Sequence, residues 1–169
     1  MNEPLAEMFR YNRWANDRLI EACTDLSEQQ LDGQVAGTFG SIRRTLVHLI
    51  GSQDVFLWRV ASDDTALAAR AATMRGAWWD PAILREFGER SSDELLAVAL
   101  RAEQDYDVLL PPWEGRRETV NASFLLLHAL AHGIQHRQQI VTTMSQLGLE
   151  PPDLDGWGYR AETAPASLN

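Results

Sequence analysis

A chain of 169 residues, of which 45% are hydrophobic and 23% charged, has the size and composition of one globular domain. Its net charge of -9 argues against nucleic acid and anionic membrane as partners, because their phosphates would repel it. The single cysteine, Cys23, excludes an intramolecular disulfide and a cysteine-rich zinc site. Since no apolar run reaches the roughly 18 residues of a membrane span and the N-terminus lacks a secretory-signal layout, we expect a cytoplasmic protein.

The first predicted helix runs from about Glu3 to Thr24, with Asn2 as its N-cap. Its apolar stripe is interrupted by Asn12 and Asn16, which is unusual because a buried amide needs hydrogen-bond partners. These asparagines either line or support a functional site or tie the helix to neighbouring backbone carbonyls. A capping box at residues 27–30 then predicts a short helical turn.

The second predicted helix begins after Ser41, ends near Ala61 and carries His48 near its middle. Residues 62–90 have less regular patterning and are predicted to form a long crossover with some helix. The tryptophan pair at 78–79 belongs either to the core or to a cover over a pocket. A second capping box, at residues 91–94, predicts a third helix over 92–110, ended by the prolines at 111 and 112.

The fourth predicted helix covers residues 121–147 and has Gly148 as its C-cap. It is apolar on nearly all sides between Phe124 and Ile134, whereas a helix of a small bundle normally shows water one polar face. Either the crossover or a second copy of the chain must cover it, and we expect a homodimer. Four helices with no run of strand alternation predict an all-α four-helix bundle with a long crossover between helices two and three. The tail from Arg160 onward is predicted to be disordered.

All four histidines lie in two apolar helical segments. His128, His132 and His136 recur every fourth residue and therefore share a helix face. At ~1.5 Å rise per residue, the first and last are about 12 Å apart and cannot bind the same ion. The ligand pair is therefore either His128 with His132 or His132 with His136, completed by His48. Three imidazoles would leave one metal position open for water or substrate.

The competing interpretation is an ordinary core, because a lone histidine on an apolar helix is usually a hydrogen-bonded core residue. Three histidines in register, with the fourth on another core helix, favour the metal site. No carboxylate accompanies them as in H-E-x-x-H, so a zincin-type protease is not indicated. Three imidazoles suit zinc and nickel, which we expect first, and also iron or manganese. Arg137 is a candidate for holding an anionic substrate group, whereas Cys23 is more typical of a small core residue than of a nucleophile.

Four segments in order resemble the DinB/YfiT-like family of damage-inducible metalloproteins, and together they extend over most of the chain. They are YNRWANDRLIEA at 11–22, SIRRTLVHLIGSQDVFLWR at 41–59, HALAHGIQHRQQI at 128–140 and QLGLEPPDLD at 146–155. The second contains the first metal histidine of the family and the third its H-x-x-x-H-R pair. One departure is Gln138, where the family commonly has glycine after the arginine.

The resemblance implies that His48, His132 and His136 bind one divalent metal and that His128 is a neighbour. It leaves four residues as candidates to support the ligands or contact the substrate, namely Asn12, Asn16, His128 and Arg137. It also implies a single DinB-like domain over residues 1–159, followed by the tail at 160–169. The implied topology is an up-down-down-up bundle, and dimers are frequent in the family.

The family includes bacillithiol transferases and mycothiol-dependent maleylpyruvate isomerases, while many members have no assigned reaction. We therefore expect a metal-dependent enzyme that transfers a small-molecule thiol to an electrophile, since coordination deprotonates a thiol. One alternative is a metal-dependent hydrolase that activates water. Another is a stress-related metal-binding protein without turnover. A requirement for thiol separates the first from the second, and a closed four-ligand shell would favour the third.

Overall fold

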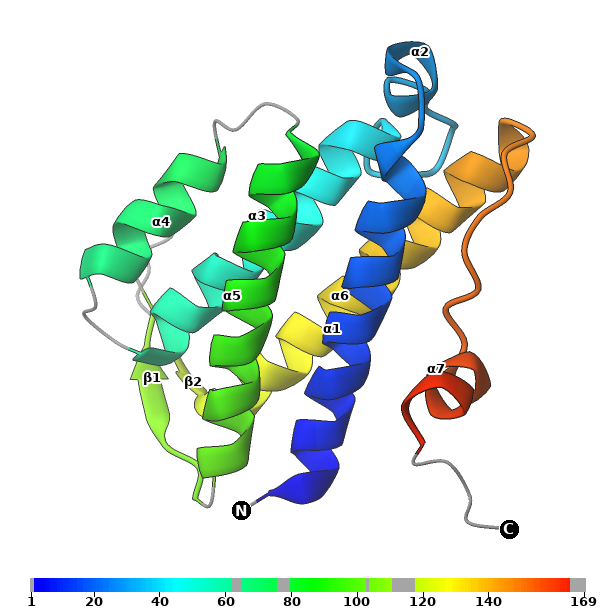
Figure 1. The fold of residues 1–169 in the computed structure, drawn as a ribbon. Helices are drawn as coiled ribbons and strands as arrows, with labels where there is room; N and C mark the ends of the chain where they lie inside the picture. The colour runs from blue at the N-terminus through cyan, green and yellow to red at the C-terminus, as the bar shows by residue number, and fades with distance from the viewer. Residues whose placement is uncertain (1, 62–64, 76–79, 103, 111–117, 165–169) are drawn as a thin grey trace, which may run out of the picture.

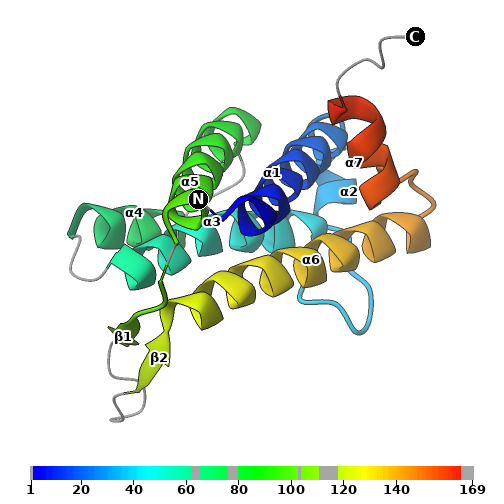
Figure 2. The same ribbon diagram turned by 90° about the horizontal axis from the view of Figure 1, so that it is seen from below.

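The computed structural model describes residues 2–61, 65–75, 80–102, 104–110 and 118–164, and this part of the chain is mostly helical. Four long helices lie side by side in Figure 1, and Figure 2 shows the same arrangement from below. They are α1 (Glu3–Thr24), α3 (Ile42–Ala61), α5 (Pro81–Arg101) and α6 (Ala122–Gln146). The shorter elements are α2 (Glu28–Leu31), α4 (Thr65–Arg75), β1 (Asp107–Leu109), β2 (Thr119–Asn121) and α7 (Gly156–Thr163).

Each long helix packs against two others, with α1 and α3 both lying between α5 and α6. Buried side chains from all four helices fill two apolar clusters, one containing Phe9 and Leu125 and the other Leu19 and Ile140. The short helix α4 packs on α3, and α7 packs on α1. The contact between α3 and α6 is the one that positions the histidines. No helix in the described part of the chain combines the length and apolar character that crossing a membrane requires.

The predicted helix boundaries agree closely with the structure for α1, α3 and α6. Asn2 caps α1, since its side chain accepts a hydrogen bond from the Leu5 N–H. The predicted capping box at Ser27 is present at the start of α2. Ser41 accepts from the Arg44 N–H at the start of α3. Gly148 follows α6 with a φ of 74°, a conformation that favours glycine.

The prediction for the third long helix is wrong at both ends, because α5 begins at Pro81 and ends at Arg101. Asp80 is the true N-cap, accepting from two backbone N–H groups, and Pro81 fits the first helical position. Ser91 is instead a buried helix residue whose hydroxyl donates to the Phe87 carbonyl one turn earlier. The serine–acid pattern therefore mimicked a cap inside a continuous helix.

Three other expectations concern the strands, the C-terminal segment and residues outside the described ranges. The prediction of no strand is wrong, because β1 and β2 form an antiparallel hairpin in which Val108 pairs with Val120. Residues 160–163 are the last turn of α7 and not the start of a disordered tail. The tryptophan pair at 78–79 and the prolines at 111 and 112 lie outside the described residues.

Candidate metal centre

Helices α3 and α6 bring three of the four histidines together. One nitrogen of each of His48, His132 and His136 lies within 4.8 Å of the others. The Nε2 atoms of His48 and His132 are 3.0 Å apart, although these residues are 84 positions apart in the chain. His128 lies outside the group, is exposed, and has its ring centroid 6.1 Å from that of His132. Of the two pairs that spacing left open, the structure therefore brings His132 and His136 together with His48.

The distance between the His48 and His132 nitrogens fits a shared metal ion. At a metal–nitrogen distance of about 2.0–2.1 Å, two ligands of a tetrahedral ion have nitrogens about 3.3 Å apart. The 3.0 Å contact between His48 and His132 is close to this value and requires one nitrogen to donate and the other to accept. The donor set also suits a borderline transition metal. In the described part of the chain, no aspartate, glutamate or cysteine joins the group.

The three imidazoles lie in surroundings that keep them neutral. Burial, together with the charges of the neighbouring histidines, lowers the pKa of His132 to about 3. Burial also lowers the pKa of His48, to which the charges of His136 and Arg44 contribute. The pKa of His136 is lowered by burial, against the effect of the hydrogen bond that it donates to Gln139. Since only neutral imidazole binds a metal, all three are in the competent form at pH 7.

Gln139 fixes which nitrogen of His136 is available. Its Oε1 lies 2.8 Å from His136 Nδ1, and because an amide oxygen only accepts, Nδ1 carries the proton. The lone pair is thereby left on Nε2. Sequence reasoning missed Gln139, although its position three residues after His136 on one helix was an available signal.

Two phenylalanines pack against the imidazoles. Phe39, from the loop before α3, stacks on His48 with centroids 4.3 Å apart and an interplanar angle of 20°. It also meets the His136 ring edge-on at 5.1 Å. Phe56, about two turns after His48 on α3, contacts the rings of His128 and His132. These rings pack on the imidazoles and restrict their orientation. Phe39 lies in a loop, so no periodic pattern marked it.

Replacing Gln139 by alanine should weaken metal binding about 10-fold to 100-fold, because the orientation and tautomer of His136 are then free. Gln139→Glu retains an acceptor and should bind nearly as the wild type. Competition titration against a chelator gives the affinities. Gln138→Ala is the matched control, since this neighbour is exposed and contacts Thr142 only weakly. Equal affinities for Gln139→Ala and the control would show that the hydrogen bond has no role in binding.

The asparagines of α1 are joined to Arg137 of α6 and not to the imidazoles. Arg137 is 2% exposed and its Nη1 donates to the Oδ1 atoms of Asn12 and Asn16, both at 2.7 Å. Burial lowers the pKa of Arg137 to about 10. A Cβ at position 133 would lie 2.6 Å from Asn12 Oδ1, so Gly133 leaves the room that this network needs. Of the alternatives that the sequence left open, the structure favours a tie between helices, made to a side chain and not to backbone.

Burial also argues against Arg137 as a substrate-binding residue and against Cys23 as a nucleophile. Arg137 is enclosed between α1 and α6, a position that does not present its charge to a substrate at the imidazoles. Cys23 is also fully buried, and burial raises its thiol pKa to about 12. A thiol with that pKa is protonated at pH 7 and is a poor nucleophile. Cys23 is a core residue in this structure.

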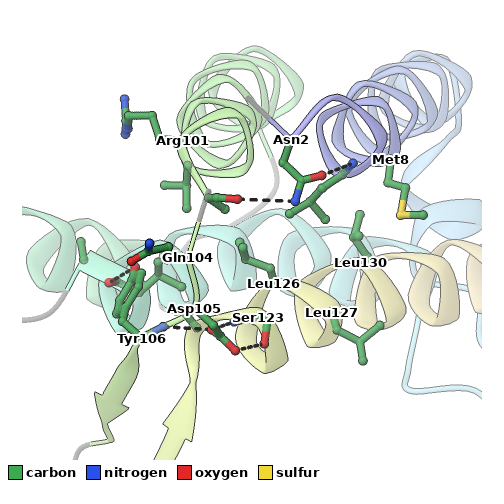
Figure 3. Close-up of a pocket in the computed structure, with 16 residues that line it drawn as sticks. Asn2, Met8, Arg101, Gln104, Asp105, Tyr106, Ser123, Leu126, Leu127 and Leu130 are labelled. Atoms are coloured by element: carbon green, nitrogen blue, oxygen red, sulfur yellow. Dashed lines mark hydrogen bonds between the residues drawn. The ribbon is translucent and has the colours of Figure 1, made fainter.

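Figure 3 shows a separate pocket of about 870 Å³ near the start of α6. It lies between the N-terminal part of α1, the C-terminal part of α5 and the first turns of α6, and none of the four histidines lines it. Leu126, Leu127 and Leu130 form its apolar wall on α6. Asp105 at its edge accepts hydrogen bonds from both the N–H and the hydroxyl of Ser123, in the first turn of α6.

Comparison with known proteins covers nearly the whole chain. The sequence model of the DinB family matches residues 1–166, which include all three clustered histidines. The Protein DinB of Bacillus subtilis (strain 168) is 25% identical over 166 aligned residues, and the match covers 88% of each chain. The chain belongs to the DinB family.

Proposed function

We propose that this protein is a metal-dependent enzyme that transfers a small-molecule thiol to an electrophile, with His48, His132 and His136 as the ligands of one metal. The observation that carries the proposal is the convergence of three neutral imidazoles without a fourth protein ligand among the described residues. Zinc or nickel is the metal that we expect, with iron or manganese as alternatives. We also take the four long helices as the up-down-down-up bundle of the family, in keeping with their directions in Figure 1.

When bound, the metal would supply Lewis acidity that lowers the pKa of a thiol and makes it a nucleophile at neutral pH. The residues of the chain would bind the metal, orient its ligands and surround the reacting groups. The three imidazoles would hold the metal, and Gln139 orients the His136 ring. Phe39, which is 37% exposed, packs against His48 and His136 and provides an apolar surface for the reacting groups.

Thiol transfer is favoured over hydrolysis by what surrounds the imidazoles. Hydrolysis needs the pKa of water lowered from about 15.7 to about 7, a much larger shift than a thiol needs, and no carboxylate base joins the described histidine group to assist it. A coordinated thiol needs no such base, because coordination deprotonates it. The third alternative, a stress-related metal-binding protein without turnover, would be favoured by a closed coordination shell.

The test compares the metal-loaded wild type with Cys23→Ala and His48→Ala, using several small thiols and monochlorobimane as a soft electrophile. Loss of free thiol should require the metal, persist in Cys23→Ala and disappear in His48→Ala. A chelator should abolish it, and added metal should restore it. Activity that survives in His48→Ala but is lost in Cys23→Ala would reverse the assignment. Hydrolysis of a simple ester without thiol dependence would support the hydrolase instead.

We further propose that the protein is a homodimer assembled through α6. Phe124, Leu127 and Ile134 are 50%, 63% and 54% exposed. With the exposed Ala131 they form a stripe at 3-4-3 spacing, typical of helices that pack against a partner helix. The crossover helix α4 packs on α3 and so does not cover them.

Light scattering at micromolar concentration should therefore give a mass near twice 19.0 kDa. Leu127→Lys combined with Ile134→Lys should produce a folded monomer, because two charges would be buried without partners in the interface. Ile83→Lys is the matched control, since Ile83 is an exposed apolar residue on another helix, α5. A monomeric wild type, or dimerisation unaffected by the double substitution, would contradict the proposed interface.

A further inference from the structure

The guanidinium of Arg44 lies close to the imidazoles, separated from His48 by the ring of Phe39. The Cζ of Arg44 is 5.0 Å from the centroid of the Phe39 ring, and that ring stacks on His48. Arg44 and His48 are four residues apart on α3 and therefore share a helix face. The order along this edge of the site is imidazole, phenyl ring and guanidinium.

The guanidinium of Arg44 can bind an anion from solution, whereas that of Arg43 is already paired with acidic side chains. Arg44 is exposed, and within the described ranges no carboxylate pairs with its guanidinium. Arg43 is paired with both Glu28 and Asp32 on the other side of α3. An arginine left without an acid beside a candidate site, in a chain of net charge -9, is free to bind an anion from solution.

The backbone holds the stem of Arg44 in place. A Cβ at Gly40 would lie 2.9 Å from Arg44 Cδ, so the side chain passes close over the bare backbone of the loop that carries Phe39. Contacts to Gly40 and Phe39 restrict the rotamers of Arg44 before a ligand arrives. A guanidinium that is already positioned loses less entropy on binding.

We propose that Arg44 binds the carboxylate of the small thiol that this site uses, with Phe39 forming the apolar wall between that carboxylate and the imidazoles. The inference rests on the proposed thiol transfer and adds the substrate class, a thiol that carries a carboxylate. A planar guanidinium with several N–H donors matches a carboxylate in two parallel hydrogen bonds. The buried Arg137, which the sequence suggested for this role, is enclosed by Asn12 and Asn16.

The test measures the binding of two matched thiols, 8-mercaptooctanoate and 8-mercaptooctanamide, which differ only in the charge of the terminal group and are long enough to extend from the imidazoles past Phe39 to Arg44. Titration calorimetry on the zinc-loaded protein gives both dissociation constants. The wild type should prefer the carboxylate about fivefold, as expected for one exposed charge-assisted contact. Arg44→Gln should abolish this preference, and higher salt should reduce it in the wild type. Arg43→Gln changes the net charge equally and should retain the preference.

Equal binding of the two thiols by the wild type, or a preference that persists in Arg44→Gln, would overturn the role of Arg44 and leave the proposed thiol transfer intact. A preference lost equally in Arg43→Gln and Arg44→Gln would show a general charge effect and would also overturn it. If neither thiol binds to the zinc-loaded wild type, both the inference and the proposed function fail. Binding does not depend on turnover, so the measurement separates recognition from catalysis.

Discussion

Replacing His132 by alanine should abolish tight metal binding, whereas replacing His128 by alanine should leave one metal per chain. His132 occupies the centre of the group, because its Nε2 is 3.0 Å from that of His48 and its ring centroid is 4.3 Å from that of His136. Without it, the two remaining nitrogens cannot hold an ion with the original geometry. The affinity should fall by well over about 100-fold, which is more than the loss of a supporting neighbour causes.

The histidines four residues apart provide matched controls on one helix. His128→Ala removes an imidazole of the same size and chemistry, but one whose side chain is exposed and outside the cluster. His136→Ala should behave like His132→Ala. Elemental analysis after dialysis gives the stoichiometry, and circular dichroism confirms that each variant retains its helices. Loss of the metal in His128→Ala together with its retention in His136→Ala would show that the other pair binds it.

The histidine cluster could be predicted because its determinants on α6 are local and periodic. The three histidines of α6 share a face through their spacing alone, and the resemblance to the family selected the pair that the structure brings to His48. The α1, α3 and α6 boundaries were also predictable, since caps and apolar stripes agree there. What spacing could not supply was the position of α3 across from α6, which depends on packing between distant segments.

The errors and omissions share a physical cause. Ser91 and Ser92 read as a helix start, yet their hydroxyls are satisfied by a carbonyl one turn earlier and by Gln53 on another helix. A short hairpin of three-residue strands is held by cross-strand pairing and leaves little alternation in the sequence. Phe39 reaches the imidazoles from a loop, so no helical periodicity indicated it. For Ser92, the hairpin and Phe39, the deciding contact is with a residue far away in the chain.

Substituting methionine for Arg137 should lower the free energy of unfolding by about 2–3 kcal/mol, because it leaves the buried oxygens of Asn12 and Asn16 without their donor. Both oxygens accept from the same Nη1 atom at 2.7 Å, and both asparagines are almost fully buried. The loss should not be larger, because burial already penalises the charge of Arg137, as its lowered pKa shows, and methionine removes that cost. Urea denaturation of the metal-free protein measures the change.

Two further variants identify the cause. Arg43→Met removes an arginine that pairs with exposed acids, and it should cost less than about 1 kcal/mol. Adding Asn12→Leu and Asn16→Leu to Arg137→Met removes the unpaired oxygens and should recover much of the lost stability. Metal stoichiometry should stay at one in Arg137→Met, because the described contacts of Arg137 lead to α1 and not to the imidazoles. Wild-type stability combined with loss of the metal would instead place Arg137 in the metal centre.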